Sequence, residues 1–157
     1  MNAHSDSDNA PRDGDRPAAD PRLACLAHLC SGFGVESIYA FGSRGKDVAD
    51  WLRGGLASLD GDERDVDIGV RTRQPLDVHD KVQLAIALED YLSVTRVDLV
   101  CLPDADPFVA ASIVRGERLH ETDLYAGAEY ELYVLRRAGD LIPLEEERAA
   151  LVLGRGS

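Results

Sequence analysis

Three strand-like apolar segments of this chain carry polar residues that constrain what it can fold into. The segments are Ser37–Phe41, Arg64–Arg71 and Arg96–Leu102. A Gly-Ser pair follows the first segment, and the other two contain Asp65, Asp67 and Asp98. Aspartate is disfavoured in strands, and a buried carboxylate costs free energy unless it is paired. We therefore expect these carboxylates to serve a site, and the obvious use is to hold divalent cations against phosphate oxygens.

Side-chain alternation along strands predicts how these carboxylates meet. Successive side chains point to opposite faces, so Asp65 and Asp67 share one face, with Cα atoms roughly 6.5 to 7 Å apart. In the third segment Asp98 shares a face with Arg96, opposite the apolar Val97. If the two segments are neighbouring strands, Asp98 joins the pair. Two magnesium ions about 3.5 to 4 Å apart are then expected, one on a triphosphate and one on an attacking hydroxyl.

The residues after the first segment predict a phosphate-binding turn. Gly42 permits a tight turn and close approach of the backbone, and Ser43 is expected to cap the helix that follows. The free N–H groups and the dipole of that helix would then face an anion. Arg44 lies in the first turn, where it is expected to add positive charge.

Turn signals and apolar periodicity divide the rest of the chain. We expect an acidic, disordered leader over residues 1–20, a core over 21–121 with an insert at about 47–63, and a helical extension over 122–157. The expected helices are 21–32, 44–54, 76–92, 106–115 and 122–138, the last stopped by Gly139, with a further helix opened by Pro143. A short strand is expected over 117–120. The 157 residues suffice for one compact core.

Charge and composition exclude several classes of function. The formal net charge is −12, which argues against a broad basic surface for duplex nucleic acid. A nucleotide is compatible with this charge, because bound magnesium and a few basic groups neutralise a triphosphate. The apolar stretches are too short to cross a bilayer, and the N-terminus has no signal-peptide pattern, so we expect a cytoplasmic protein without membrane contact. The three cysteines lie in apolar runs typical of buried thiols.

These motifs resemble the nucleotidyltransferase superfamily of DNA polymerase beta, and the small size resembles its minimal, MNT-type members. The resemblance covers about Ile38–Leu102 and rests on Phe41-Gly42-Ser43, Asp65-Val66-Asp67 and Asp98. It implies an α/β (α+β) fold with a mixed β-sheet flanked by helices, and transfer of a nucleoside monophosphate from a triphosphate, by preference ATP, with Mg2+.

The resemblance also implies residue roles and a partner. Gly42 and Ser43 would contact the triphosphate, Asp65 and Asp67 would bind metals, and Asp98 would complete the metal site and favour deprotonation of the acceptor. Minimal members are often paired with a small helical HEPN protein, in some cases as antitoxins that adenylylate a toxin. This chain departs from its relatives in a longer connection between Ser43 and Asp65, and in having only a short helical tail instead of a substrate-recognition domain.

Two other interpretations remain open on the residues alone. Asp65 and Asp67 would have no catalytic meaning if they faced solvent on an edge strand after the acidic loop 60–63. The chain would also be a binding module if its nucleotide site were degenerate and its acidic surface blocked a partner. The sequence leaves the acceptor open among a protein tyrosine, a small molecule and an RNA end.

Overall fold

The computed structural model describes residues 20–154, with the side chains of 143–145 and 152–154 left aside. The expected leader, residues 1–20, lies outside the described residues except for Asp20, which caps the first helix by accepting from the Arg22 N–H. No helix in the described part of the chain is long and apolar enough to cross a membrane.

A four-stranded mixed sheet forms the centre of the molecule. Its strands are Val35–Phe41 (β1), Val66–Thr72 (β2), Val97–Cys101 (β3) and Glu117–Glu121 (β4), in the spatial order β3-β2-β1-β4. β1 is antiparallel to both of its neighbours, whereas β2 and β3 are parallel. Parallel strands need a crossover connection, which a helix supplies here. The expected mixed sheet flanked by helices is confirmed.

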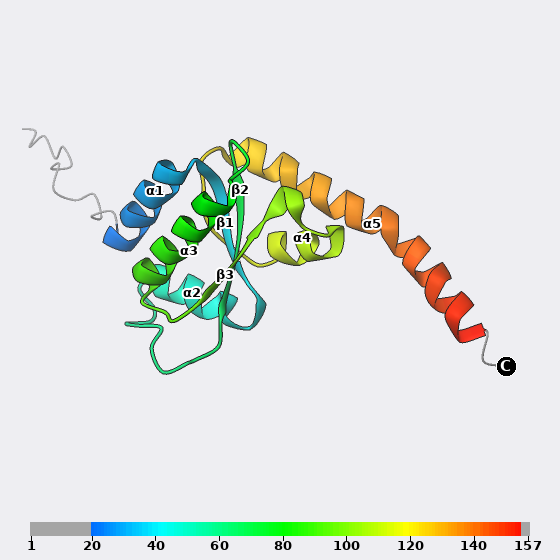
Figure 1. Ribbon diagram of the computed structural model, residues 1–157, viewed down its shortest axis with the longest axis horizontal. Coiled ribbons are helices and arrows are strands. Elements are labelled where there is room, and N and C mark those ends of the chain that lie inside the picture. Colours follow the sequence, from blue (N-terminus) through cyan, green and yellow to red (C-terminus); the bar gives the residue numbers. More distant parts are fainter. Residues whose placement is uncertain (1–19, 155–157) are drawn as a thin grey trace, which may run out of the picture.

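Helices cover both faces of this sheet (Figure 1). The first face packs against Pro21–Phe33 (α1), Gly45–Leu52 (α2) and Val78–Leu92 (α3), and the second against Pro107–Val114 (α4) and Leu124–Gly154 (α5). Short 3-10 turns at Gly42–Arg44 (η1) and Leu102–Asp104 (η2) follow β1 and β3. Because α4 and α5 leave the start of β2 and β3 uncovered, this edge of the second face is open for a site.

Strand alternation sorts the apolar side chains into two cores. Ile38 and Ile68 are fully buried under the first three helices, while Tyr39 belongs to the core beneath α4 and α5. Gly69 lets α4 approach the sheet closely, because a Cβ there would lie 2.3 Å from Cγ2 of Ile113. Two layers of helices are thus fixed on one sheet by the period-two pattern.

The C-terminal helix differs from the expectation. We expected a helix to end before Gly139 and another to begin at Pro143, but α5 is continuous from Leu124 to Gly154. Glycine ends a helix efficiently when its backbone turns left-handed, and Gly139 is absent from the described residues with positive φ. In a helical conformation glycine costs only about 1 kcal/mol, so the helix continues through it.

A buried ionic cluster anchors the start of α5 to the sheet. The Glu121 side chain is only 2% exposed, and its carboxylate accepts from Arg71 Nη2 at 3.2 Å and from the Ser37 hydroxyl. Arg71 also donates to Glu36 at 2.7 Å and lies over the ring of Tyr130 on α5. The charges on three strands and the aromatic ring on the helix therefore hold one another in place.

Removing the cation from this cluster should destabilise the fold strongly. Arg71→Met leaves the Glu121 carboxylate buried without its partner, which typically costs about 3 to 5 kcal/mol in the free energy of unfolding. Arg73→Met is the matched control, because the Arg73 side chain is 72% exposed and pairs with Glu36 at 3.5 Å; its cost should stay below about 1 kcal/mol. Urea unfolding of the three proteins measures both values, and equal costs would contradict the anchoring role.

Candidate functional site

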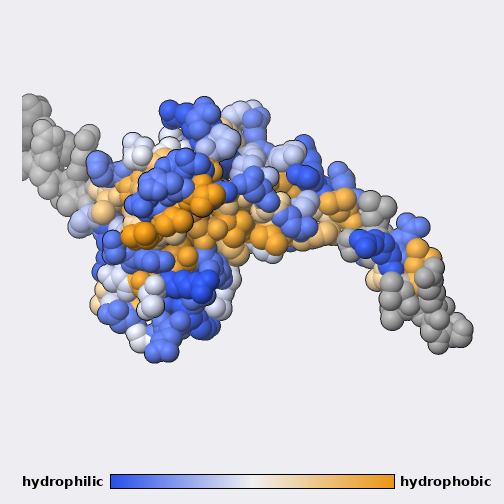
Figure 2. Space-filling view, in the orientation of Figure 1, coloured by the Kyte–Doolittle hydropathy of each residue, from blue (hydrophilic) through white to orange (hydrophobic). Residues whose placement is uncertain are grey.

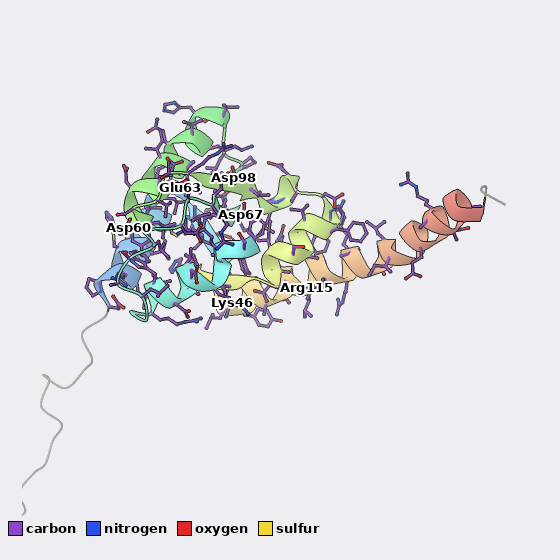
Figure 3. The ribbon with its side chains drawn as sticks, turned by 90° about the horizontal axis from the view of Figure 1, so that it is seen from below. Lys46, Asp60, Glu63, Asp67, Asp98 and Arg115 are labelled. Atoms are coloured by element: carbon purple, nitrogen blue, oxygen red, sulfur yellow. The ribbon has the colours of Figure 1, made fainter. Side chains whose placement is uncertain are left out.

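The pairing of three strands brings the expected carboxylates and the Gly-Ser turn to one edge. Asp67 on β2 lies directly opposite Asp98 on β3, and Phe41, the last residue of β1, lies opposite Asp67 on its other side. Figure 3 shows Asp67 and Asp98 next to each other at this edge. The alternation is as expected, since Val66 and Ile68 are buried on the face opposite Asp67.

Asp65 lies one residue before β2, where the backbone is already joined to β3. The Val66 N–H donates to the Arg96 carbonyl at 3.0 Å, and Val66 pairs with Val97. The side chains of Asp65 and Asp98 are 42% and 44% exposed, so both carboxylates are open to solvent ions. The structure therefore places the three aspartates that the sequence singled out at one edge of the sheet, where Asp65 and Asp98 both interact electrostatically with Asp67.

Gly42 lies against the central carboxylate. Its φ of +70° is the left-handed conformation that glycine adopts most readily. A Cβ at this position would lie 2.3 Å from Oδ2 of Asp67, so any other residue would displace the carboxylate. The Gly-Ser turn and the aspartates are thus in direct contact, although 21 residues separate Ser43 from Asp65 in the chain.

Ser43 differs from its expected role as a helix cap. It lies within η1, and the residue preceding α2 is Arg44, which makes no side-chain capping hydrogen bond. Among the described residues, no hydrogen bond of the Ser43 hydroxyl is found, and the residue is exposed. The hydroxyl is therefore available to an anion, whereas the first N–H of α2, that of Gly45, donates to the Gly42 carbonyl.

Arg44 also differs from its expected position beside the phosphates. Its side chain is only 2% exposed and points into the protein. Nη1 donates to the Arg64 carbonyl at 3.0 Å and Nη2 to the Leu59 carbonyl at 2.6 Å, while Nε lies 3.7 Å from an Asp62 oxygen without a hydrogen bond. Arg44 therefore ties the residue after Ser43 to the residue before Asp65, and it is not free to bind a phosphate.

The insert begins later than expected and is held at a second point. Residues 47–52 belong to α2, so the irregular connection runs from 53 to 65, and Trp51 is a buried helix residue. The Arg22 guanidinium lies 4.5 Å from the centre of the Trp51 ring and donates to the carbonyls of Leu56 and Ala57. Arginines from α1 and η1 thus fix the long connection to the core.

The electrostatics of the site are concentrated on Asp67. Partial burial raises the pKa of its carboxyl group, and the nearby charges of Asp98 and Asp65 raise it further. A carboxylate crowded by two others gains from any cation bound between them. This is the electrostatic arrangement that a metal site requires.

One cation of the protein already lies among these carboxylates. Arg96 Nε is 3.7 Å from Oδ2 of Asp65, and Arg96 Nη2 is 3.5 Å from Oδ1 of Asp98. Strand alternation placed Arg96 on the face of Asp98, and this spacing was a signal that it belongs to the site. The contacts of Arg22 and Arg44 with loop carbonyls leave no comparable pattern in the sequence.

The donor set fits magnesium. Within residues 20–154, no three His, Cys, Asp or Glu side chains converge to hold one metal ion by themselves. Mg2+ rarely uses such a cage, since it binds through one or two carboxylates together with substrate phosphates and water. Asp67 and Asp98 on adjacent strands, beside a turn that a Cβ would fill, match that requirement.

Comparison with known proteins gives a family and a fold. The model of the family described as polymerase beta, nucleotidyltransferase, matches residues 26–125, which is more than half of the chain and includes every residue of the site. No curated protein sequence gives a significant match.

Three solved structures of low sequence identity share the fold. A mutant of the toxin–antitoxin pair MntA–HepT matches with a TM-score of 0.61 and 20% identity, covering 86% of this chain and 98% of that one. A toxin–antitoxin structure with AMP-PNP matches with a TM-score of 0.59 and 21% identity, covering 86% of this chain and 98% of that one. The structure of a tri-AMPylated HEPN toxin of Shewanella oneidensis in complex with an MNT antitoxin matches with a TM-score of 0.56 and 23% identity. The match covers 87% of this chain and 97% of that one.

Replacing Arg44 should loosen the connection between α2 and β2. Arg44→Lys cannot donate to both the Leu59 and Arg64 carbonyls in the same geometry, and we expect a loss of about 2 to 4 kcal/mol in stability. Chymotrypsin should then cleave faster after Leu56 and Leu59. Arg53→Lys is the control, because the Arg53 side chain is 65% exposed. Unchanged cleavage and an unchanged urea midpoint in Arg44→Lys would refute the tie.

Neutralising the central carboxylate should stabilise the metal-free protein. The pKa of Asp67 is raised in the fold, so its ionised form opposes folding and stability falls as pH rises through that pKa. With EDTA at pH 7, Asp67→Asn should unfold at a higher urea concentration than the wild type. The difference should vanish below about pH 3.9, the ordinary pKa of aspartate, where the wild-type side chain is neutral. A lower midpoint at pH 7 would disprove the crowding.

Proposed function

Because this chain belongs to the polymerase beta nucleotidyltransferase family, we propose that it is a magnesium-dependent enzyme that transfers AMP from ATP to an acceptor hydroxyl. The acceptor is a protein or a small molecule, and the protein acts as the antitoxin of a HEPN-type toxin pair. One observation carries the proposal: Asp67 lies opposite Asp98 on parallel strands and against the Gly42 turn.

The residues of the site divide the work of binding. The exposed Ser43 hydroxyl binds the triphosphate, and the left-handed turn at Gly42 allows the phosphates to approach the backbone. Asp65, Asp67 and Asp98 would hold the Mg2+ ions, with Asp67 interacting with the other two. When bound, Mg2+ neutralises phosphate charge and lowers the pKa of an acceptor hydroxyl.

The transfer itself needs positioning more than covalent catalysis. The acceptor oxygen forms a bond to the α-phosphorus, the bond from that phosphorus to the bridging oxygen of the β-phosphate breaks, and pyrophosphate leaves with the electron pair. The Asp98 carboxylate takes the proton of the acceptor hydroxyl. Asp98 suits this role because it is at the outer side of the pair and 44% exposed.

The partner in this proposal has support from two sources. Structures with the same fold include an MNT antitoxin in complex with an AMPylated HEPN toxin, and one with AMP-PNP. The surface of this chain also offers apolar side chains to a partner. Figure 2 shows apolar surface over α3 and along α4 and α5. The exposed apolar residues of these helices include Val78, Val82, Ile86, Phe108, Val109, Leu132 and Tyr133.

That same surface supports a second candidate, an interaction module that neutralises its partner by binding alone. A hollow of about 230 Å³ between α4 and α5 is lined by Tyr130, Tyr133 and Arg137. Contiguous apolar surface of this kind marks protein–protein contact sites. The two candidates differ in whether protection from the toxin requires the carboxylates.

The enzymatic proposal predicts label transfer that depends on Asp67. With ATP labelled at the α-phosphate, Mg2+ and a co-encoded helical partner or lysate, the wild type should label an acceptor. Asp67→Asn should reduce the rate by about a hundredfold or more, because it removes a preorganised charge from the phosphoryl site. EDTA should abolish the labelling.

A matched variant separates a local effect from a change of net charge. Asp104→Asn removes a carboxylate that is 71% exposed and pairs with Lys81 away from the site, so it should label at the wild-type rate. Equal labelling by Asp67→Asn would eliminate the enzymatic assignment. Full protection from the toxin by Asp67→Asn, without label transfer, would favour the interaction module.

A further inference from the structure

Arg96 holds two of the three site carboxylates in the structure. Its guanidinium group lies between Asp65 and Asp98, at 3.7 Å and 3.5 Å from one oxygen of each. The backbone beneath it is fixed, because the Arg96 carbonyl accepts the Val66 N–H at 3.0 Å. The side chain is 67% exposed, so it can move into solvent while its backbone stays in place.

We propose that Arg96 competes with divalent metal for Asp65 and Asp98 and thereby sets the affinity of the cluster for the metal. The proposal rests on the proposed function, because it takes the cluster to be the metal site. Carboxylate oxygens that face a guanidinium group are less available to a second cation. The charge of Arg96 also repels a metal ion approaching between them.

The geometry of the pairs makes this competition reversible. Both separations exceed the 2.7 to 3.2 Å of a direct N–H to oxygen hydrogen bond, so Arg96 neutralises the carboxylates without binding them tightly. An exposed arginine is displaced more readily than a buried one such as Arg44. Arg96 therefore offsets the negative charge of Asp65 and Asp98 in the metal-free protein and yields when metal enters.

The reach of the Arg96 side chain allows one residue to contact two carboxylates. The fork of Arg96 directs Nε to Asp65 and Nη2 to Asp98, and a lysine ammonium has no second nitrogen with which to do the same. Arg96→Gln removes the charge altogether. Neither change affects the backbone hydrogen bond from Val66, so both variants keep the pairing of β2 with β3.

Calorimetric titration with Mn2+ alone, without nucleotide, tests the proposal in the full chain. Loss of two exposed ion pairs should lower the Kd of Arg96→Gln by roughly two- to tenfold relative to the wild type. The Kd of Arg96→Lys should lie between those of Arg96→Gln and the wild type. Arg73→Gln is the matched control, because Arg73 is 72% exposed and pairs with Glu36 away from the site; its Kd should equal that of the wild type.

A second measurement follows the side chain itself. The Nε–H resonance of Arg96, identified by its loss in Arg96→Gln, should shift when Mg2+ is added to the wild type. An equal or higher Kd in Arg96→Gln, with saturable binding in all four proteins, overturns the competition and leaves the proposed function standing. An unmoved resonance at saturating Mg2+ does the same. No saturable binding in any of the proteins overturns the metal site and this inference together.

Discussion

The register between the parallel strands β2 and β3 is the constraint on which the core and the site both depend. Val66 pairs with Val97, so Asp67 must lie opposite Asp98 one residue later. The valines point into the core, and the aspartates point to the other face of the sheet. A slip of one residue would bring the carboxylates into the apolar layer and the valines to the surface. Burial of the apolar face therefore supplies the free energy that holds like charges together on the other.

A buried arginine and a half-buried arginine hold the long connection between α2 and β2 against the core. Arg44 and Arg22 donate hydrogen bonds to carbonyl groups at both ends of the segment. The guanidinium of Arg44 joins the backbone beside Ser43 to the backbone beside Asp65. An insertion in this position can therefore be tolerated while the turn and the carboxylates stay in one arrangement.

Local patterns predicted most of the fold and the composition of the site. Apolar runs bounded by turn signals identified β1, β2 and β3, and period-two alternation along β2 and β3 predicted the shared face of Asp67 and Asp98. The helix expected from residue 106 is α4, where the Asp106 side chain accepts from the Phe108 N–H. The errors have common physical causes. Gly139 remains helical because nothing there demands a left-handed backbone, and the burial of Arg44 depends on carbonyls 15 and 20 residues away. Contacts between distant segments leave no periodicity to detect.

Because α5 is unbroken, its C-terminal half projects from the molecule in one direction. Its first half is clamped by Arg71 and by the buried Val134 and Ala138, whereas Figure 1 shows the remainder extending away from the sheet. At 1.5 Å per residue, the helix reaches about 24 Å beyond Ala138, the last buried residue among its described side chains. A partner bound at the far end of this helix would therefore be held at a set offset from the aspartates.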